Sequence, residues 1–441
     1  MQSYIEEFVK IFLEKTEKKQ IQLIGHFDAD GITSTTILTK TLERLEKNFS
    51  TKIVKQFSEE EIKKIPIDKV IILVDIGSAG IDSLSRLKNE IFIIDHHELQ
   101  IRSVIPENLH ILNPHLHDDY QEVCSAELSY LFARTLTEEN KDLAHLAVIG
   151  MVGDTMEKNI NKIRNQIINE ADVRIKRGLL LYPSTRPLDK TLEFSSRPFI
   201  PGITGNWNNV IELLKEAGIE KIGKHYKALI DLTDSEMKSL ATAITLRLPA
   251  ETFDYIGNLY LIKFFNKIED AREIAAIINA CSRMDRPDIA LLVCLGNSDA
   301  RKKAARLYVQ YRQYIISGLK FIEKNNFIKG EEYVIINAKN NIKDTIIGTL
   351  ASILSFSSVY KEGTIIIAMA YTNNKIKIST RMTGRKANRN LKELLNEITA
   401  SLGRGESGGH KYAAGCTILL EDEEKFIELV KNKLQYELVK V

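Results

Sequence analysis

The sequence predicts an α/β protein in which a parallel sheet carries helices on both of its faces. Up to about residue 155, short runs rich in Val, Ile and Leu alternate with stretches of helical apolar spacing. Continuous apolar runs between helices are typical of parallel strands that are buried on both faces. Similar runs return near the C-terminus, and they predict a second, smaller α/β domain.

Four strands are predicted in the N-terminal part, at 21–25, 70–75, 91–95 and 109–113. Residues 1–20 mix charged and apolar side chains and lack the apolar core of a signal peptide, so they predict a helix. The polar segment HFDADG follows the first strand and leads directly into another helical pattern. Because open α/β sheets bind ligands in the loops after their strands, we expect the functional residues in these loops.

The length of 441 residues predicts about three domains, at residues 1–160, 161–330 and 331–441. The middle part is predicted to be mainly helical, and the last part is expected to lie across a cleft from the first. The stretch 182–207 holds four of the nine prolines and predicts an irregular loop. This loop is expected to be ordered through its apolar residues Phe194, Phe199, Ile200 and Trp207.

The last part contains strand-like runs at 333–338, 364–371 and 375–381, followed by a glycine cluster and a final helix. The longest apolar runs of the chain, at 289–295 and 364–370, are far below the roughly 18 to 20 residues that cross a bilayer. Both are therefore predicted to be buried strands.

The composition is that of an ordinary soluble globular protein, with 44% hydrophobic and 27% charged residues. The four cysteines are widely spaced and form no C-x-x-C pair, which favours reduced core cysteines over a disulfide framework. With no signal or membrane segment recognised, we expect a cytoplasmic protein that contacts no membrane.

The net charge of +2 conceals an uneven distribution. Residues 1–160 hold 18 basic and 27 acidic side chains, a net of −9, whereas residues 161–441 hold 43 and 32, a net of +11. The segment 375–411 alone has nine basic and three acidic residues. This segment is either a solvated basic face or a surface that binds a phosphate backbone.

Acidic residues and histidines follow the predicted apolar runs in four places. They are His26, Asp28 and Asp30 in HFDADG, Asp75 in VDIGSAG, Asp95, His96 and His97 in DHHE, and Asp154 in GMVGDT. Carboxylate oxygens and imidazole nitrogens without nearby cysteines suit Mn²⁺ or Mg²⁺. A single Asp after a strand is usually a helix N-cap, so the interpretation depends on all four segments converging. Together they provide enough ligands for two metals, which can hold both oxygens of a phosphoryl displacement.

These four segments, in this order, resemble the motifs of the DHH-family phosphoesterases. The terminal GRGESGGHKYAAG resembles the glycine-histidine motif of the DHHA1 domain. The H-x-D-x-D-G form is similar to that of RecJ-type exonucleases. The segments STRPL…SSRPFIPGITG and INACSRMDRPDIALLVCLGN resemble archaeal RecJ-like proteins, relatives of the GINS-associated nuclease and of Cdc45. The resemblance covers roughly the whole chain.

The resemblance implies two divalent ions, Mn²⁺ or Mg²⁺, that share one bridging carboxylate. Carried over by position, one ion is held by His26, Asp28 and Asp75, and the other by Asp30, Asp75, His96 and Asp154. Asp95 then orients a histidine, and His97 faces the scissile phosphate as electrophile or proton donor. The attacking group is expected to be a hydroxide that bridges the ions.

In the C-terminal part, the resemblance implies that Arg381 contacts the substrate, because a guanidinium binds phosphate bidentately. It also implies that Ser407, Gly408, Gly409 and His410 approach a phosphate. Ser407 stands where the family has a glycine, which puts the contribution of this motif to affinity in question.

We therefore expect a two-metal exonuclease that releases mononucleotides from single-stranded DNA, and possibly RNA. One alternative is a phosphodiesterase of short oligonucleotides or cyclic dinucleotides. Another is a replisome scaffold like Cdc45, although all seven ligand-type positions are present here. GINS or a repair helicase is a candidate partner, and the sequence leaves the polarity of digestion and the oligomeric state open.

Overall fold

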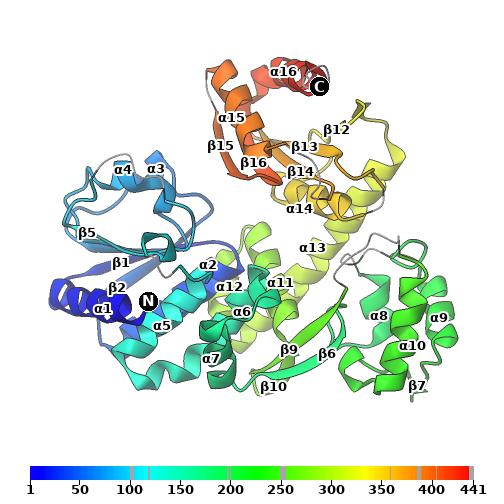
Figure 1. Cartoon of the computed structure of the whole chain (residues 1–441), viewed down its shortest axis with the longest axis horizontal. Helices are drawn as coiled ribbons and strands as arrows, with labels where there is room; N and C mark the ends of the chain where they lie inside the picture. The colour runs from blue at the N-terminus through cyan, green and yellow to red at the C-terminus, as the bar shows by residue number, and fades with distance from the viewer. Residues whose placement is uncertain are drawn as a thin grey trace. The chain divides into compact units, whose positions relative to one another are not determined.

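The computed structural model describes residues 1–99, 104–117, 120–195, 198, 200–248, 255–357, 359–384, 389–403 and 405–436. The chain forms two compact units (Figure 1). The first comprises Met1–Arg177 and Asn258–Tyr308, and the second comprises Gly178–Gly257 and Val309–Val441. Whether the parts before 160, between 161 and 330 and after 331 fold as separate domains stays a prediction.

A five-stranded parallel sheet in the order β2-β1-β3-β4-β5 forms the centre of the first unit. Its strands are β1 (Ile21–His26), β2 (Phe49–Val54), β3 (Val70–Val74), β4 (Ile91–Ile94) and β5 (Leu109–Leu112). The four predicted strands and the parallel sheet are confirmed. The edge strand β2 was not predicted, because only Val54 of its six residues is buried and its sequence has no apolar run.

Helices cover both faces of this sheet, as predicted (Figure 1). On one face lie α1 (Gln2–Thr16), α2 (Ala29–Arg44) and α5 (Ser125–Leu136). Phe8 and Phe12 of α1 and Phe132 of α5 pack there against Phe92 of β4. The short helices α3 (Glu59–Ile62) and α4 (Ile81–Leu84) pack on the other face.

The remaining elements of the first unit pack against α2 and α5 in a second core. They include α6 (Ala144–Gly153), α7 (Lys162–Glu170), α11 (Ala271–Arg283), α12 (Pro287–Cys294) and the start of α13 (Ser298–Lys324). A three-stranded sheet in the order β10-β9-β6 joins them, which the sequence analysis did not predict. Its strands are β6 (Arg174–Leu179), β9 (Ile256–Phe264) and β10 (Lys267–Asp270).

The prediction of a buried strand at 289–295 is wrong, because this run lies mostly in α12. Pro287 occupies the first turn, where its missing N–H costs no helical hydrogen bond. Ile289, Ala290, Val293 and Cys294 are buried, whereas Leu292 is 43% exposed. This spacing of buried positions is helical, and it was masked by the apolar residues on the exposed face.

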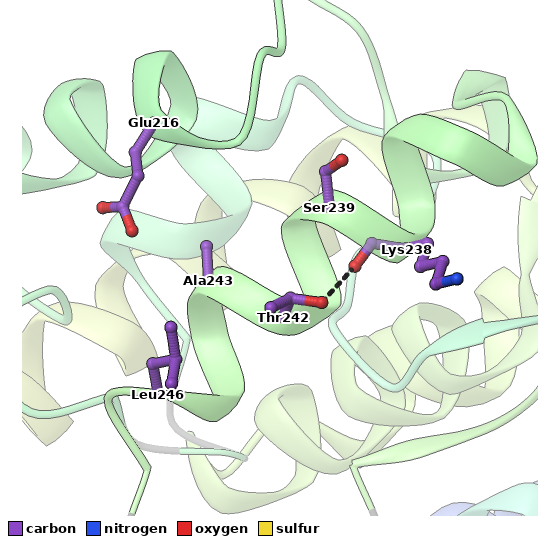
Figure 2. Close-up of a pocket in the computed structure, with 6 residues that line it drawn as sticks. All are labelled: Glu216, Lys238, Ser239, Thr242, Ala243 and Leu246. Atoms are coloured by element: carbon purple, nitrogen blue, oxygen red, sulfur yellow. Dashed lines mark hydrogen bonds between the residues drawn. The ribbon is translucent and has the colours of Figure 1, made fainter.

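In the second unit, residues 178–257 form α8 (Leu188–Glu193), α9 (Trp207–Glu216), α10 (Asp234–Thr245) and the two-residue strands β7 (Lys221–Ile222) and β8 (His225–Tyr226). Ile200 in the proline-rich stretch is buried, whereas Trp207 is 46% exposed, and Phe199 lies outside the described residues. A pocket of about 340 Å³ lies between α9 and α10. Figure 2 shows six of the residues that line it. Its lining residues, among them Glu216 and Lys238, include none of the predicted site residues.

The C-terminal part is a mixed sheet in the order β11-β12-β13-β14-β16-β15. Its strands are β11 (Ile328–Lys329), β12 (Tyr333–Asn337), β13 (Ile365–Thr372), β14 (Lys375–Met382), β15 (Glu406–His410) and β16 (Ala413–Leu419). On one face lies α14 (Asp344–Ser355), and the other face packs against α15 (Leu391–Leu402) and α16 (Glu423–Tyr436). The strands predicted at 333–338, 364–371 and 375–381 and the final helix are confirmed.

Short 3₁₀ helices connect several of these elements, at Ser78–Gly80, Pro114–Leu116, Glu138–Leu143, Met156–Lys158, Leu229–Asp231 and Leu420–Asp422. No helix within the described ranges is long and apolar enough to span a membrane.

Candidate metal centre

The polar segments after β1, β3 and β4 meet at one edge of the parallel sheet. His26 is the last residue of β1, Asp75 directly follows β3, and Asp95 directly follows β4. Because these three strands are parallel neighbours, their carboxyl ends lie side by side. Asp154 is contributed by a different element, as the C-cap of α6.

A first group of ligand-type atoms comes from His26, Asp28 and Asp75. The Nδ1 atom of His26 lies 3.1 Å from an oxygen of Asp28 and 3.2 Å from an oxygen of Asp75. Asp28 also caps α2, since its Oδ1 accepts a hydrogen bond of 3.0 Å from the amide of Gly31. A side chain at Gly31 would clash with the backbone of His26, so this tight turn requires glycine.

A second group comes from Asp30, His96 and Asp154. The Nε2 atom of His96 lies 3.9 Å from an oxygen of Asp30 and 3.7 Å from an oxygen of Asp154. It also lies 3.6 Å from Oδ1 of Asp75, whereas Oδ2 of the same carboxylate faces His26. Asp75 therefore lies between the two groups, in the position that a bridging ligand would occupy.

The first turn of α5 holds two of these carboxylates in place. The amides of Ser125 and Ala126 donate hydrogen bonds of 2.9 Å each to the two oxygens of Asp30, and the hydroxyl of Ser125 donates to Asp75 at 2.9 Å. A helix N-terminus stabilises such negative charge. The sequence analysis missed this contribution, although the segment CSAE, with Glu127 three residues after Cys124, carries a capping-box pattern.

Asp95 and His97 form an adjacent pair. Oδ1 of Asp95 lies 2.7 Å from Nδ1 of His97, and Oδ2 accepts a hydrogen bond of 3.0 Å from the amide of Ser78. The side chain of Asn113 donates to the carbonyl of His97 at 3.0 Å and to the hydroxyl of Ser78 at 3.1 Å. His97 keeps 45% of its side chain exposed, so its ring is fixed in orientation but open to a substrate.

Two further features fix the carboxylates from the backbone. Asp75 and Thr155, which follows Asp154, both have φ near +60°, a conformation that is uncommon for residues other than glycine. A side chain at Gly150 of α6 would lie 2.4 Å from Cβ of Ala126 and 2.9 Å from Oδ1 of Asp30. The helices can therefore approach Asp30 only because this position has no side chain.

The Asn279 side chain on α11, also missed from sequence, accepts a 3.0 Å hydrogen bond from the amide of Ala29.

Burial and neighbouring negative charge raise the pKa of two of these carboxylates. Burial, with the nearby charges of Asp30 and Asp28, raises the pKa of Asp154 to about 8. Burial and the same neighbours raise the pKa of Asp75 well above its ordinary value. Burial disfavours the charged form of Asp95, but hydrogen bonds from His97 and Ser78 outweigh it and hold its pKa below the usual range.

The pKa values of His96 and His97 shift in opposite directions. Burial lowers the pKa of His96, which favours the neutral ring that a metal requires. Burial also opposes charge on His97, but the hydrogen bond and charge of Asp95 outweigh it and raise the pKa of His97. His97 is therefore the better proton donor of the two.

The donor set fits divalent cations. Within each group the ligand-type atoms lie within 4.8 Å of one another, and each group combines carboxylate with imidazole. Burial and the neighbouring carboxylates both disfavour negative charge on Asp75 and Asp154, which raises their pKa values. Divalent cations would offset this negative charge, and carboxylate with imidazole is a donor set that suits Mn²⁺.

In the C-terminal sheet, the structure brings Arg381 and His410 to one face. Arg381 of β14 pairs with Ala413 of β16, which pairs with His410 of β15, so the three form one row across adjacent strands. The next row is Ser379, Gly415 and Gly408.

Ser407 faces the other way, since its hydroxyl donates to Asn396 of α15 at 2.7 Å. Gly409 has a φ of +132°, and a side chain there would lie 2.5 Å from the carbonyl oxygen of Ala413. This glycine is required by the hairpin itself. Of the predicted basic segment, Arg385, Lys386 and Arg404 lie outside the described residues.

The sequence profile of the DHH family, N-terminal domain, matches residues 20–151, which contain seven of the eight ligand and histidine positions described above. The profile of the DHHA1 domain matches residues 331–435, and that of the DHH-CID domain matches residues 181–253. Residues 20–151 therefore form a DHH-family domain. The DHH superfamily is one of hydrolytic phosphoesterases.

Two relatives of known sequence are similar to this chain. An uncharacterized protein of Methanocaldococcus jannaschii is 27% identical over 97% of this chain and 96% of its own length. The single-stranded-DNA-specific exonuclease RecJ of Bacillus subtilis is 27% identical over 32% of this chain and only 19% of its own length.

Solved structures share the fold. RecJ from Thermus thermophilus in complex with Mn²⁺ has a TM-score of 0.61 at 18% identity, and this chain spans 98% of itself but 54% of that protein. An exonuclease RecJ bound to manganese has a TM-score of 0.60 at 18% identity, with 97% and 94% covered. Cdc45 from Entamoeba histolytica has a TM-score of 0.67 at 13% identity, with 97% and 98% covered.

Proposed function

We propose that this DHH protein is a metal-dependent exonuclease that releases mononucleotides from single-stranded nucleic acid. The observation that carries the proposal is the meeting of seven ligand-type side chains and His97 from four separate segments at one sheet edge. A likeness to exonucleases of the RecJ type, in sequence and in fold, supports the choice of substrate. Two cations held there would activate water and neutralise the phosphate in an in-line displacement.

The chain's own residues have separate roles in this proposal. His26, Asp28, Asp30, Asp75, His96 and Asp154 hold the cations, with Asp75 common to both groups. His97, oriented by Asp95, faces the scissile phosphate and holds a proton that it can give to the leaving oxygen. Because the His97 ring is oriented through Nδ1, its Nε2 is the atom that reaches the substrate.

The row of Arg381, Ala413 and His410 is proposed to bind the substrate backbone. In the adjoining row, Gly415 of β16 and Gly408 of β15 have no side chains, so a phosphate can approach these two strands closely. Arg381 also donates a hydrogen bond of 2.9 Å to Ser352 of α14, which fixes the direction of the guanidinium.

The test is digestion of single-stranded 20-mers in DNA and RNA form, each labelled at either the 5′ or the 3′ end, with Mn²⁺. We expect mononucleotide release from one end by the wild-type protein and none by Asp30→Ala. The labelled end that disappears first gives the polarity. Intact strands with the wild-type protein, or equal digestion by Asp30→Ala, would contradict the proposal.

A phosphodiesterase of short oligonucleotides or cyclic dinucleotides would use the same cluster. The extended row on the C-terminal sheet favours a longer chain, because a dinucleotide cannot span several phosphate contacts. Turnover of dinucleotides that far exceeds turnover of 20-mers would favour this alternative instead.

A scaffold like Cdc45 is a second alternative, since Cdc45 shares the fold over nearly the whole chain. The fold alone does not distinguish the two roles. The complete set of ligand-type residues favours the enzyme, because a scaffold has no need for mutually repelling carboxylates. A partner such as GINS or a repair helicase is compatible with either role.

A further inference from the structure

Arg164 on α7 is the largest fully buried side chain among the described residues, with 0% of its surface exposed. Its Nε donates to Oε1 of Glu127 at 3.1 Å, and Glu127 is also 0% exposed. A buried ion pair is costly to desolvate and is seldom a net source of stability relative to apolar residues of the same size. Stability alone therefore does not explain why Arg164 and Glu127 form a buried ion pair here.

Glu127 fixes the first turn of α5. Its Oε2 accepts a hydrogen bond of 2.8 Å from the amide of Cys124, the residue before the helix. The next two amides, those of Ser125 and Ala126, are the donors to Asp30. The orientation of Glu127 therefore sets the position of Asp30.

Arg164 also contacts the segment that follows Asp154. Its Nη1 donates to the carbonyl of Asn159 at 2.5 Å, and its Nη2 contacts Sδ of Met156 at 2.8 Å. Nη2 also donates to the carbonyl of Glu122, just before α5, at 2.7 Å. One guanidinium thus ties the 3₁₀ turn after Asp154 to the segment before α5.

The geometry points to Glu127 and Arg164 as a positioning pair that sets the separation of Asp30 and Asp154, and thereby the affinity of the second ligand group for its cation. Neither residue belongs to the groups of ligand-type atoms described above. The first group, His26, Asp28 and Asp75, is placed mainly by β1, β3 and the cap of α2. Its one link to the first turn of α5 is the hydrogen bond from the Ser125 hydroxyl to Asp75, so it depends less on this pair than the second group does. The inference rests on the proposed function, because it concerns the cation site used there.

The test is a titration of the full chain with Mn²⁺ alone, followed by calorimetry and by the electron paramagnetic resonance of the bound ions. Arg164→Met is expected to leave the affinity for the first ion within twofold and to weaken the second by about 10- to 100-fold, as loss of a supporting contact behind a metal ligand usually does. The signal of two coupled ions should disappear at Mn²⁺ concentrations that saturate the wild-type protein.

Two further variants separate positioning from folding. The double variant Glu127→Gln, Arg164→Met removes both charges but keeps an acceptor for the amide of Cys124, so it avoids an unpaired buried charge. It should show the same selective loss. Phe12→Leu, in the core beneath α1, is the control for general destabilisation and should not change the ratio of the two affinities.

The outcomes are distinguishable. If the wild-type protein binds only one Mn²⁺, the two-ion site itself is overturned, and the inference with it. If the wild-type protein binds two, but both variants keep the second affinity or lose both affinities in parallel, the inference alone is overturned.

Discussion

Asp75 is the residue of the metal centre whose position is fixed by the most contacts described above. It is 2% exposed, follows a buried strand, has φ of +60°, and directs one oxygen toward His26 and the other toward His96. Its hydrogen bond from Ser125 uses an oxygen that is also near His96. Asp75→Asn would keep the shape of this side chain while removing the charge that both cations need.

The raised pKa values of Asp75 and Asp154 predict that Mn²⁺ binds with release of protons. In the metal-free protein these groups hold protons that the unfolded chain has lost, so its stability falls as pH rises from about 4 through about 8. Cation affinity rises over the same range, because Mn²⁺ competes with these protons.

Calorimetric titration with Mn²⁺ at about pH 6 and about pH 8, in two buffers of different ionisation enthalpy, measures both effects. We expect tighter binding at the higher pH and a proton release that shrinks toward it. An affinity that does not change between these pH values would contradict the assignment of Asp75 and Asp154 as ligands.

Gly150 offers a test of packing at the same site. Gly150→Ala places a methyl group 2.4 Å from Cβ of Ala126, so we expect a loss of about 1–3 kcal/mol in stability, with weaker Mn²⁺ binding. Denaturant unfolding measures the first effect. Gly80→Ala is the matched control, since a side chain at Gly80 meets nothing within 4 Å. Equal stabilities of the two variants would show that α6 does not need its close approach to Asp30.

At the scale of elements, the sequence predicted the strands that lead into the ligands, because buried parallel strands are short apolar runs followed directly by polar residues. It failed for α12, whose exposed apolar residues hide the helical pattern of burial, and for β6, whose pairing with β9 is long-range. It also missed the hairpin of β9 and β10, in which Phe264 pairs with Lys267. Arg164, Asn113 and Asn279 could not be predicted as supporting residues, because their partners lie far away in sequence.

The proposed phosphate-binding row on strands β14, β16 and β15 predicts how the protein binds single strands. Arg381→Ala should weaken binding of single strands and lower the slope of log affinity against log salt by about 1, because one phosphate contact is lost. Turnover of a dinucleotide should change little. Lys425→Ala on α16 is the control, since α16 covers the opposite face of the sheet. Binding measured by fluorescence anisotropy over a salt series checks this, and equal slopes for both variants would rule out the row as a backbone site.

For the whole molecule, the net charge of +2 is the sum of an N-terminal part with net −9 and a remainder with net +11. The structure gives part of the negative charge a definite place, in the carboxylates at the carboxyl edge of the parallel sheet. Part of the positive charge lies on the C-terminal sheet, where the row that contains Arg381 adjoins the row that contains Gly415 and Gly408. A near-neutral total is thus compatible with a protein that binds both cations and a phosphate backbone.

The most direct test is hydrolysis of a labelled single strand by protein that has been freed of metal with a chelator and then supplied with Mn²⁺. The wild-type protein should regain mononucleotide release, whereas Asp75→Asn, folded to the same extent by circular dichroism, should remain inactive at every Mn²⁺ concentration. Hydrolysis by the wild-type protein in the absence of metal would contradict the proposed two-cation exonuclease. So would hydrolysis by Asp75→Asn at the wild-type rate once Mn²⁺ is added.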